Sequence, residues 1–181
     1  MNEEALAFLN GPEGCAILAR LSEADLNEAH TLSLLAELRK TLPADLAGAA
    51  LTLARLRERG ATKFSRAGAM FFTPDALEQA SGEAIARYRA GRFAEAGYTR
   101  IADLGCGIGG DALALAGVPG ARVIGVDRDR LRLKMARANV RAYGHEADWL
   151  CADLRDPLPL RGVPAAFFDP ARREDGRRIF S

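Results

Sequence analysis

A glycine-rich segment behind an apolar run carries the clearest chemical signal in this sequence. Residues 101–110 read Ile-Ala-Asp-Leu-Gly-Cys-Gly-Ile-Gly-Gly, so Asp103 precedes glycines at 105, 107, 109 and 110. Glycine accepts positive φ without a Cβ clash and lets a ligand approach the backbone closely. A glycine loop between a strand and a helix is typical of a nucleotide-binding site.

The acid in front of the glycines decides between two classes of nucleotide. Gly105, Gly107 and Gly110 fit the G-x-G-x-x-G pattern of dinucleotide-binding proteins. That interpretation places a pyrophosphate at the N-terminus of the following helix, where anions are favoured. Asp103 would repel a pyrophosphate, but it suits S-adenosylmethionine, which carries an ammonium group and a sulfonium and has no phosphate. Asp103 therefore favours S-adenosylmethionine over NAD.

Acidic residues recur where the apolar runs of the second half end. Asp127 lies 22 positions after Gly105, at the end of the second run, where its carboxylate can accept hydrogen bonds from both ribose hydroxyls. Asp153, after the third run, can accept from the adenine amino group. An acid at a strand end is also a common turn or helix-cap residue, and for Asp153 both interpretations stay open.

The spacing of apolar residues, which predicts the elements that position these side chains, changes near residue 97. Residues before it show helical spacing of apolar side chains, including a helix from Thr73 and Pro74 to about Ala90. Short strands then alternate with helices, which predicts a parallel sheet with its ligand at the carboxyl ends of the strands. We expect a helical domain over 1–95 and an α/β domain over 96–181. The expected strands are 99–104, 122–126, 148–151 and 163–168, and the helices between them 110–116 and 131–143.

Composition bounds the function classes. The chain has 181 residues, is 49% apolar and carries a net charge of +1. This near-neutral charge argues against binding of nucleic acid through the electrostatic field of the whole chain. The sequence contains no run of about 18 uncharged apolar residues, which is the length that would predict a membrane span. The N-terminus is acidic, and Cys15, Cys106 and Cys151 have no metal-ligand spacing. We expect a cytoplasmic protein with free thiols and no metal site.

The acid–glycine segment, Val126-Asp127-Arg-Asp, Met135-Ala-Arg-Ala-Asn139 and Cys151-Ala-Asp153 together resemble the successive motifs of class I S-adenosylmethionine-dependent methyltransferases. Lys63-Phe64, Phe72-Thr73 and Asp169-Pro-Ala-Arg-Arg173 are similar to bacterial members with a THUMP-like C-terminal domain, in the trimethylguanosine-synthase-like group. The resemblance implies a Rossmann-like α/β fold and S-adenosyl-L-methionine as the cofactor. It implies these cofactor-binding residues: Asp103, Gly105, Cys106, Gly107, Gly109, Asp127, Arg128, Asp153 and Thr73. For Cys106 we expect a tolerated small side chain rather than a nucleophile, since no His accompanies it.

The segment from Asp169 to Arg172 is the predicted wall of the methyl-acceptor site. In related amino-methyltransferases the acid and the proline carbonyl accept hydrogens from an exocyclic amine, and an aromatic residue stacks on the base. This sequence keeps Asp169 and Pro170 but has Arg172 in the aromatic place, which also resembles RNA uracil-C5 methyltransferases. We expect Asp169, Pro170 and Arg172 to be catalytic, with tRNA or rRNA as the substrate. The basic residues after Pro170 fit a phosphate backbone, or equally a solvated loop.

Four expected strands are fewer than the seven of a complete class I fold, so we expect a fragment of a longer enzyme that could be inactive alone. The last strand would leave an apolar edge that favours pairing with another chain, for example in a homodimer. Two other function classes stay open: an NAD(P)-binding Rossmann oxidoreductase domain and a non-catalytic interaction module that keeps the nucleotide fold.

Overall fold

A computed structural model describes residues 1–169, 173–174 and 177–178, without the side chain of Glu28. Contacts divide the chain into two compact units, Met1–Leu77 and Glu78–Ser181. The boundary lies before the helix Glu83–Glu95, which the sequence places in the helical domain, because that helix packs against the helix Ala112–Ala116.

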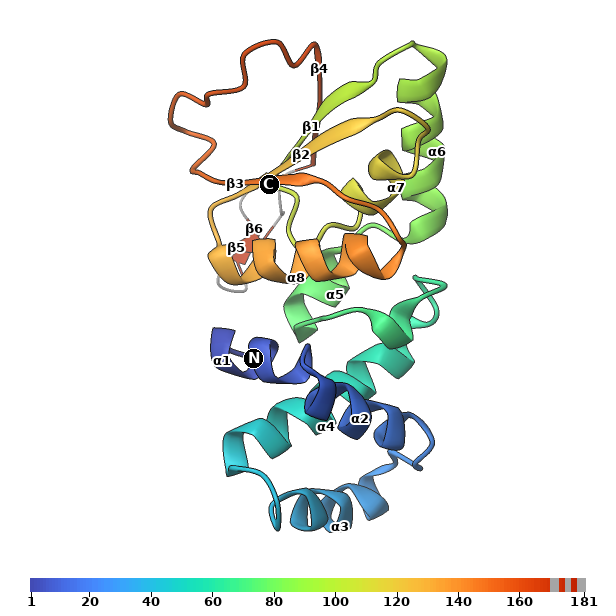
Figure 1. Ribbon diagram of the computed structural model, residues 1–181, viewed down its shortest axis with the longest axis vertical. Coiled ribbons are helices and arrows are strands. Elements are labelled where there is room, and N and C mark those ends of the chain that lie inside the picture. Colours follow the sequence, from blue (N-terminus) through green and yellow to red (C-terminus); the bar gives the residue numbers. More distant parts are fainter. Residues whose placement is uncertain (170–172, 175–176, 179–181) are drawn as a thin grey trace. The chain divides into compact units, whose positions relative to one another are not determined.

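The first unit is helical (Figure 1). Its helices are α1 (Glu3–Leu9), α2 (Pro12–Ser22), α3 (Glu28–Leu38) and α4 (Ala44–Gly60), followed by the 3-10 turn η1 (Ala67–Ala69) and the start of α5 (Pro74–Gln79). The three helices α1, α2 and α3 all pack on α4. Apolar spacing along α4 explains this, because Ala47, Ala50 and Leu53 are fully buried on one face of it.

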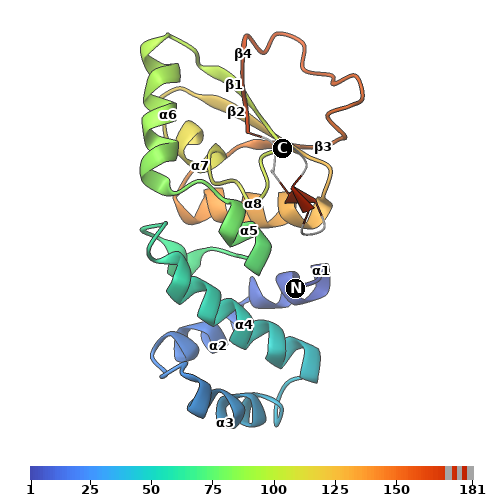
Figure 2. The same cartoon turned by 180° about the vertical axis from the view of Figure 1, so that it is seen from behind.

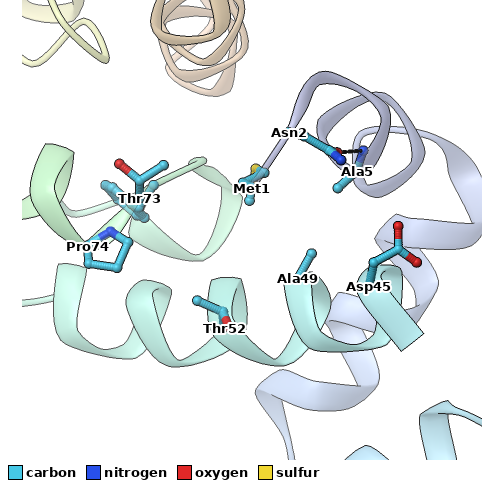
Figure 3. A pocket seen from close by; sticks show the side chains of 9 residues that line it. Met1, Asn2, Ala5, Asp45, Ala49, Thr52, Thr73 and Pro74 are labelled. Carbon is cyan, nitrogen blue, oxygen red and sulfur yellow. Dashed lines mark hydrogen bonds between the residues drawn. The ribbon is translucent and has the colours of Figure 1, made fainter. Parts of the chain in front are cut away.

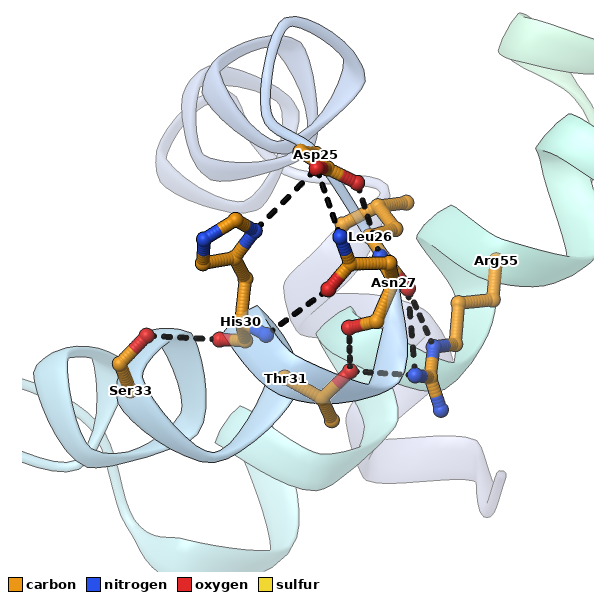
Figure 4. Close-up of polar contacts among 7 residues, drawn as sticks. All are labelled: Asp25, Leu26, Asn27, His30, Thr31, Ser33 and Arg55. Atoms are coloured by element: carbon orange, nitrogen blue, oxygen red, sulfur yellow. Dashed lines mark hydrogen bonds and ion pairs between the residues drawn. The ribbon is translucent and has the colours of Figure 1, made fainter.

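Polar contacts fix the start of α3 (Figure 4). The side chain of Asn27 caps the helix by accepting the backbone N–H of His30 at 3.0 Å. Arg55 of α4 donates to the carbonyl of Leu26 at 3.2 and 3.3 Å and to the hydroxyl of Thr31. These contacts anchor the exposed α3 to α4 through its first turn.

The second unit is an α/β sheet that confirms the predicted fold class. It contains α6 (Glu83–Glu95), β1 (Arg100–Leu104), α7 (Ala112–Ala116), β2 (Arg122–Asp127), α8 (Arg130–Ala142), β3 (Asp148–Cys151) and β4 (Ala165–Phe168). The four strands form a parallel sheet in the order β3-β2-β1-β4. Helices α6, α7 and α8 lie on one side of it, and the connection 152–164 lies on the other (Figures 1 and 2). A short antiparallel pair, β5 (Arg173–Glu174) with β6 (Arg177–Arg178), was not predicted.

Register places one row of residues across the helix-covered face of the sheet. Asp103 of β1 pairs with Gly125 of β2 and with Phe167 of β4, and Gly125 pairs with Trp149 of β3. Paired residues of neighbouring strands point to the same face. A Cβ at Gly125 would lie 2.5 Å from the Trp149 ring, so the absence of a side chain there makes room for the indole. Asp103 is thus flanked by Gly125 and the Phe167 ring.

One sequence-based expectation about the helices differs from the structure. The single helix expected from Pro74 to about Ala90 is two helices, because the chain breaks at residues 80–82 between α5 and α6. Gly82 adopts extended backbone there and serves as the N-cap of α6. Among the described residues, no helix is long and apolar enough to cross a bilayer.

Candidate cofactor and methyl-acceptor site

The glycine loop after β1 has the backbone that its sequence predicts. Gly105, Gly107 and Gly109 have φ values of +76°, +55° and +82°, which side chains with a Cβ rarely adopt. The N–H groups of Gly105 and Cys106 donate to the carbonyl of Val126 at 2.8 and 3.0 Å. These bonds hold the loop against the end of β2.

Helix α8 packs directly against the glycine loop. A Cβ at Gly109 would lie 3.1 Å from the Cβ and 3.2 Å from the Cα of Ala136, so the loop and helix touch backbone to backbone. The buried amide of Asn139 donates to the carbonyl of Ile108 at 2.9 Å. Asn139 belongs to one of the methyltransferase-like sequence motifs, but the motif alone predicts no role for it. A buried polar side chain on the inner face of an amphipathic helix was the signal that could have assigned one.

Asp103 is a buried carboxyl with an unused oxygen. Its side chain is 2% exposed, and its Oδ2 has no hydrogen-bond partner among the described residues. Burial, followed by the nearby charge of Asp111, raises the pKa of Asp103 to about 8; the backbone N–H of Ala112 and the charge of Arg89 act in the opposite direction. A buried, unpaired acceptor is costly unless a ligand supplies the donor. The arrangement therefore fits a cationic group such as an ammonium.

Asp127 at the end of β2 links the loop to the next turn. Its Oδ2 accepts the N–H of Gly107 at 2.9 Å, and its Oδ1 accepts the N–H of Asp129 at 2.9 Å. The residue is 8% exposed. Each carboxylate oxygen has a second lone pair, so two further donors from a ribose can be accommodated.

Asp153 is held by a neighbour in its own turn. Arg155 donates to Asp153 from its backbone N–H at 3.0 Å, from Nε at 3.0 Å and from Nη2 at 2.6 Å. These hydrogen bonds hold the pKa of Asp153 well below its usual range, with the charge of Arg128 contributing in the same direction. The turn-residue interpretation accounts for this geometry, and the adenine interpretation stays a prediction. Arg128 itself is exposed.

The side chain of Cys106 lies inside the fold rather than at a reacting position. It is 7% exposed, and its Sγ would be 3.2 Å from a Cβ on Gly125. Burial, with the charges of Asp103 and Asp127, raises the pKa of this thiol far above its usual range. A thiol in that setting is not a nucleophile, so the backbone of Cys106 is what it can offer to a ligand.

The methyl-acceptor residues are described only in part. Asp169 follows β4, and its half-exposed carboxylate accepts from Nη2 of Arg89 at 3.5 Å. Pro170 and Arg172 lie outside the described residues. Arg89 was not predicted as a site residue, because an arginine on a helix in an arginine-rich chain looks like an ordinary surface residue.

Thr73 lies in the first unit, before α5. Its hydroxyl accepts the N–H of Ala76 at 3.3 Å, which caps that helix. It also lines a surface pocket of that unit (Figure 3). The other residues lining this pocket are Met1, Asn2, Ala5, Asp45, Ala49, Thr52, Phe72 and Pro74. The assignment of Thr73 to the cofactor stays a prediction.

Family models match the chain in two places. Residues 101–169, which hold the four-stranded sheet and the glycine loop, match the methyltransferase domain family. Residues 3–60 match a domain family described as a domain of unknown function (DUF8688).

Curated relatives match only part of their own length. An uncharacterized S-adenosylmethionine-dependent methyltransferase of Mycobacterium tuberculosis (strain CDC 1551 / Oshkosh) is 42% identical over 109 residues, which are 60% of this chain and 29% of that protein. An uncharacterized RNA methyltransferase of Thermosynechococcus vestitus is 30% identical over 125 residues, 67% of this chain and 27% of that protein. The chain thus spans less than a third of the length of these relatives.

A solved structure shows the same architecture. The crystal structure of a candidate methyltransferase from Porphyromonas gingivalis W83 superposes with a TM-score of 0.51 at 21% identity, over 69% of this chain and 35% of that one. At that identity the likeness concerns the fold. Together with the parallel sheet order and the family match over 101–169, it shows that the second unit has the Rossmann-like fold of methyltransferases.

Proposed function

We propose that the chain is the cofactor-binding part of an S-adenosylmethionine-dependent methyltransferase. The observation that carries the proposal is the unpaired Oδ2 of Asp103, buried beside a glycine loop and in need of a donor. The family match over 101–169 and the names of the curated relatives support the same activity. A diphosphate suits this site less well, because its negative charge would lie close to Asp111 and Asp127 as well as to Asp103.

Each site residue has a distinct task in this proposal. Bound S-adenosylmethionine supplies an electrophilic methyl group on its sulfonium. The carboxylate of Asp103 accepts from the ammonium of the amino-acid end, and Asp127 accepts from the ribose hydroxyls. Asp169 follows β4, so it lies with Asp103 and Asp127 at the carboxyl ends of the strands. There it can accept a proton or orient a nucleophile. The protein's contribution to methyl transfer is chiefly this alignment.

RNA is the substrate class that we propose. A relative matched over 67% of this chain is named an RNA methyltransferase. In addition, α8 presents a stripe of exposed basic residues at helical spacing, formed by Arg130, Lys134, Arg137 and Arg141. The helix contains no Asp or Glu. Arg141 pairs with Glu146 at 3.1 Å, whereas no acid lies on the helix between the other three, and such a run of cations suits a phosphate backbone.

The N-terminal turn of α8 makes this stripe unusual within the chain. Helices α1, α2, α4, α5 and α6 each carry an acidic residue in the first turn, where the helix dipole favours it. The first turn of α8 has Arg130 and Arg132 instead. Arg132 pairs at 3.7 Å with Asp129, the N-cap of α8, so Arg130 is the first-turn cation that opposes the dipole and that an anionic partner would favour.

Cofactor binding is the first test. Calorimetric titration with S-adenosylhomocysteine should show binding, and Asp127→Ala should weaken it by about 1–3 kcal/mol if charge-assisted hydrogen bonds are lost. Asp148→Asn, which changes an exposed acid at the start of β3, is the matched control and should leave binding unchanged. Binding of NADH alone would favour the oxidoreductase alternative. Binding of neither ligand would favour a non-catalytic interaction module.

Methyl transfer is the second test. The protein is incubated with tritiated S-adenosylmethionine and total bacterial RNA, and label is counted in RNA and in protein. Label in RNA, reduced by the triple variant Arg130→Gln, Lys134→Gln and Arg137→Gln, supports the proposal. Label in protein but not in RNA would contradict the proposed substrate class.

Two finer expectations remain parts of the proposal. The similarity to bacterial methyltransferases with a THUMP-like domain, in the trimethylguanosine-synthase-like group, rests on the motifs quoted from the sequence. Pairing of the sheet edge with a second copy rests on β4, which is an edge strand of the four-stranded sheet with Phe168 57% exposed. Light scattering tests the dimer, and a monomer at all concentrations would contradict it.

A further inference from the structure

One guanidinium, that of Arg89 on α6, contacts both ends of the candidate site. Its Nη1 donates to Asp111 Oδ1 at 2.9 Å and to Ser81 Oγ at 2.8 Å. Its Nη2 reaches Asp169 Oδ2 at 3.5 Å, and its Cζ lies 4.8 Å from the centre of the Phe167 ring. Four groups from three segments of the chain thus converge on one side chain.

These segments belong to the two halves of the proposed reaction. Asp111 closes the glycine loop and is the N-cap of α7. Phe167 lies in β4, where its partner in the register is Asp103, and Asp169 follows two residues later. Arg89 therefore connects the segment beside the methyl donor to the segment expected to face the methyl acceptor.

The chemistry of the contact explains why an arginine is present. The planar guanidinium can donate to two carboxylates while one face stacks on an aromatic ring, which a lysine ammonium cannot do. The environment is also partly buried, since the side chains of Arg89 and Asp111 are 30% and 13% exposed. An isolated exposed ion pair would contribute little to stability, ~0–1 kcal/mol, but a shared, stacked cation fixes geometry as well.

We propose that Arg89 is a positioning residue, which holds the Asp169 segment at a fixed place relative to the glycine loop and so aligns the acceptor site with the methyl donor. The inference rests on the proposed function. Arg89 does not touch the reacting atoms in this proposal. It acts through Asp111 on one side and through Asp169 and Phe167 on the other.

Three variants of the full chain test the coupling. Arg89→Met removes the charge, Arg89→Lys keeps it without the planar fork, and Arg92→Met removes an exposed arginine elsewhere on α6 as the matched control. Hydrogen exchange is measured by mass spectrometry in peptides covering 108–115 and 163–169. Binding of S-adenosylhomocysteine is measured by calorimetry in parallel.

We expect Arg89→Met to raise exchange at least threefold in both peptides and to weaken S-adenosylhomocysteine binding severalfold. Arg89→Lys should restore slow exchange in the 108–115 peptide and should restore S-adenosylhomocysteine binding. The 163–169 peptide should still exchange fast, because one ammonium cannot span both carboxylates. A purely structural role would be rescued equally in both places. With an RNA that the wild type methylates, Arg89→Met should lower kcat more than it raises the KM for S-adenosylmethionine.

Two results would overturn the inference: faster exchange in only one of the two peptides of Arg89→Met, or the same response in Arg92→Met. The failure of the proposed function is a separate outcome. A wild type that binds no S-adenosylhomocysteine would refute the methyltransferase, while the exchange measurements would still show whether Arg89 couples the two segments.

Discussion

The ends of β1 and β3 carry the same sequence signal, an acid at or just after the end of an apolar strand, but the two acids have opposite surroundings. Asp103 is buried with one oxygen unpaired, and its pKa is raised to about 8. Asp153 is partly exposed, and hydrogen bonds from Arg155 hold its pKa below the usual range. Sequence spacing alone does not distinguish Asp103 from Asp153.

The difference shows that a strand-end acid becomes a ligand group through what its neighbours leave unsatisfied. Asp153 already has a cation two residues away, so a bound ligand must displace Arg155 to use both carboxylate oxygens. Asp103 has an unpaired acceptor oxygen in a buried environment, with other acids nearby. A cationic ligand would therefore offset the free-energy cost of burying that oxygen without a donor. Four experiments can break or sharpen this comparison.

The largest expected effect is on stability as a function of pH. Asp103 keeps its proton in the folded chain up to about pH 8, whereas its ordinary pKa is 3.8. The folded state therefore holds one extra proton between these values, and the free energy of unfolding falls as pH rises through that window and levels off above it. Urea unfolding should show a loss on the order of 3 kcal/mol or more between pH 4.5 and 8. Asp103→Asn should lack this loss, and Asp148→Asn should keep it.

The next effect is on ligand affinity. Asp103→Ala should weaken S-adenosylhomocysteine binding by about ten- to a hundredfold, because a buried charge-assisted hydrogen bond is worth ~1.5–3 kcal/mol. Calorimetry at pH 8 measures this directly. An unchanged dissociation constant would remove Asp103 from the cofactor site.

Affinity should also depend on pH in a direction set by Asp103. An ammonium binds best to the carboxylate form, so binding below pH 8 must release the proton from Asp103. The association constant should rise with pH from 6 to 8, by at most about tenfold per unit, and flatten above 8. Titrations in buffers of different ionisation enthalpy count the released proton. A flat profile in the wild type would contradict the assignment.

The smallest effect is expected at β3. Asp153→Asn should change S-adenosylhomocysteine affinity by less than about threefold, because Arg155 already engages the carboxylate and an exposed ion pair is screened by solvent. A loss as large as that of Asp103→Ala would show that Arg155 gives way to adenine. The comparison between the two strand ends would then need revision.

Much of the fold of the second unit follows from local patterns. The expected strand 148–151 matches β3, and the others differ from the structure by at most two residues at an end. Alternation of strands and helices made the parallel sheet predictable, since crossover helices connect parallel neighbours. The helical first unit was predicted in outline, but the break between α5 and α6 was not, because the apolar spacing continues across Gly82.

The site was predictable where its residues are close in sequence. The glycine loop, Asp103 and Asp127 were found because glycines and strand-end acids have fixed spacing. Arg89 and Asn139 were not assigned roles, because their partners are Asp111 and Ile108, more than twenty residues away. Burial was equally invisible, so the sequence could not separate Asp103 from Asp153.

The hydrogen bond from Asn139 to the Ile108 carbonyl has a consequence for how a ligand is received. The loop is also joined to Asp127 and Val126, so hydrogen bonds within the protein fix its shape. Association then requires little additional ordering of the backbone, so less of the interaction energy is lost to entropy. In a glycine loop held this way, selectivity between rival small molecules comes from the shape and charge of the loop and its neighbours.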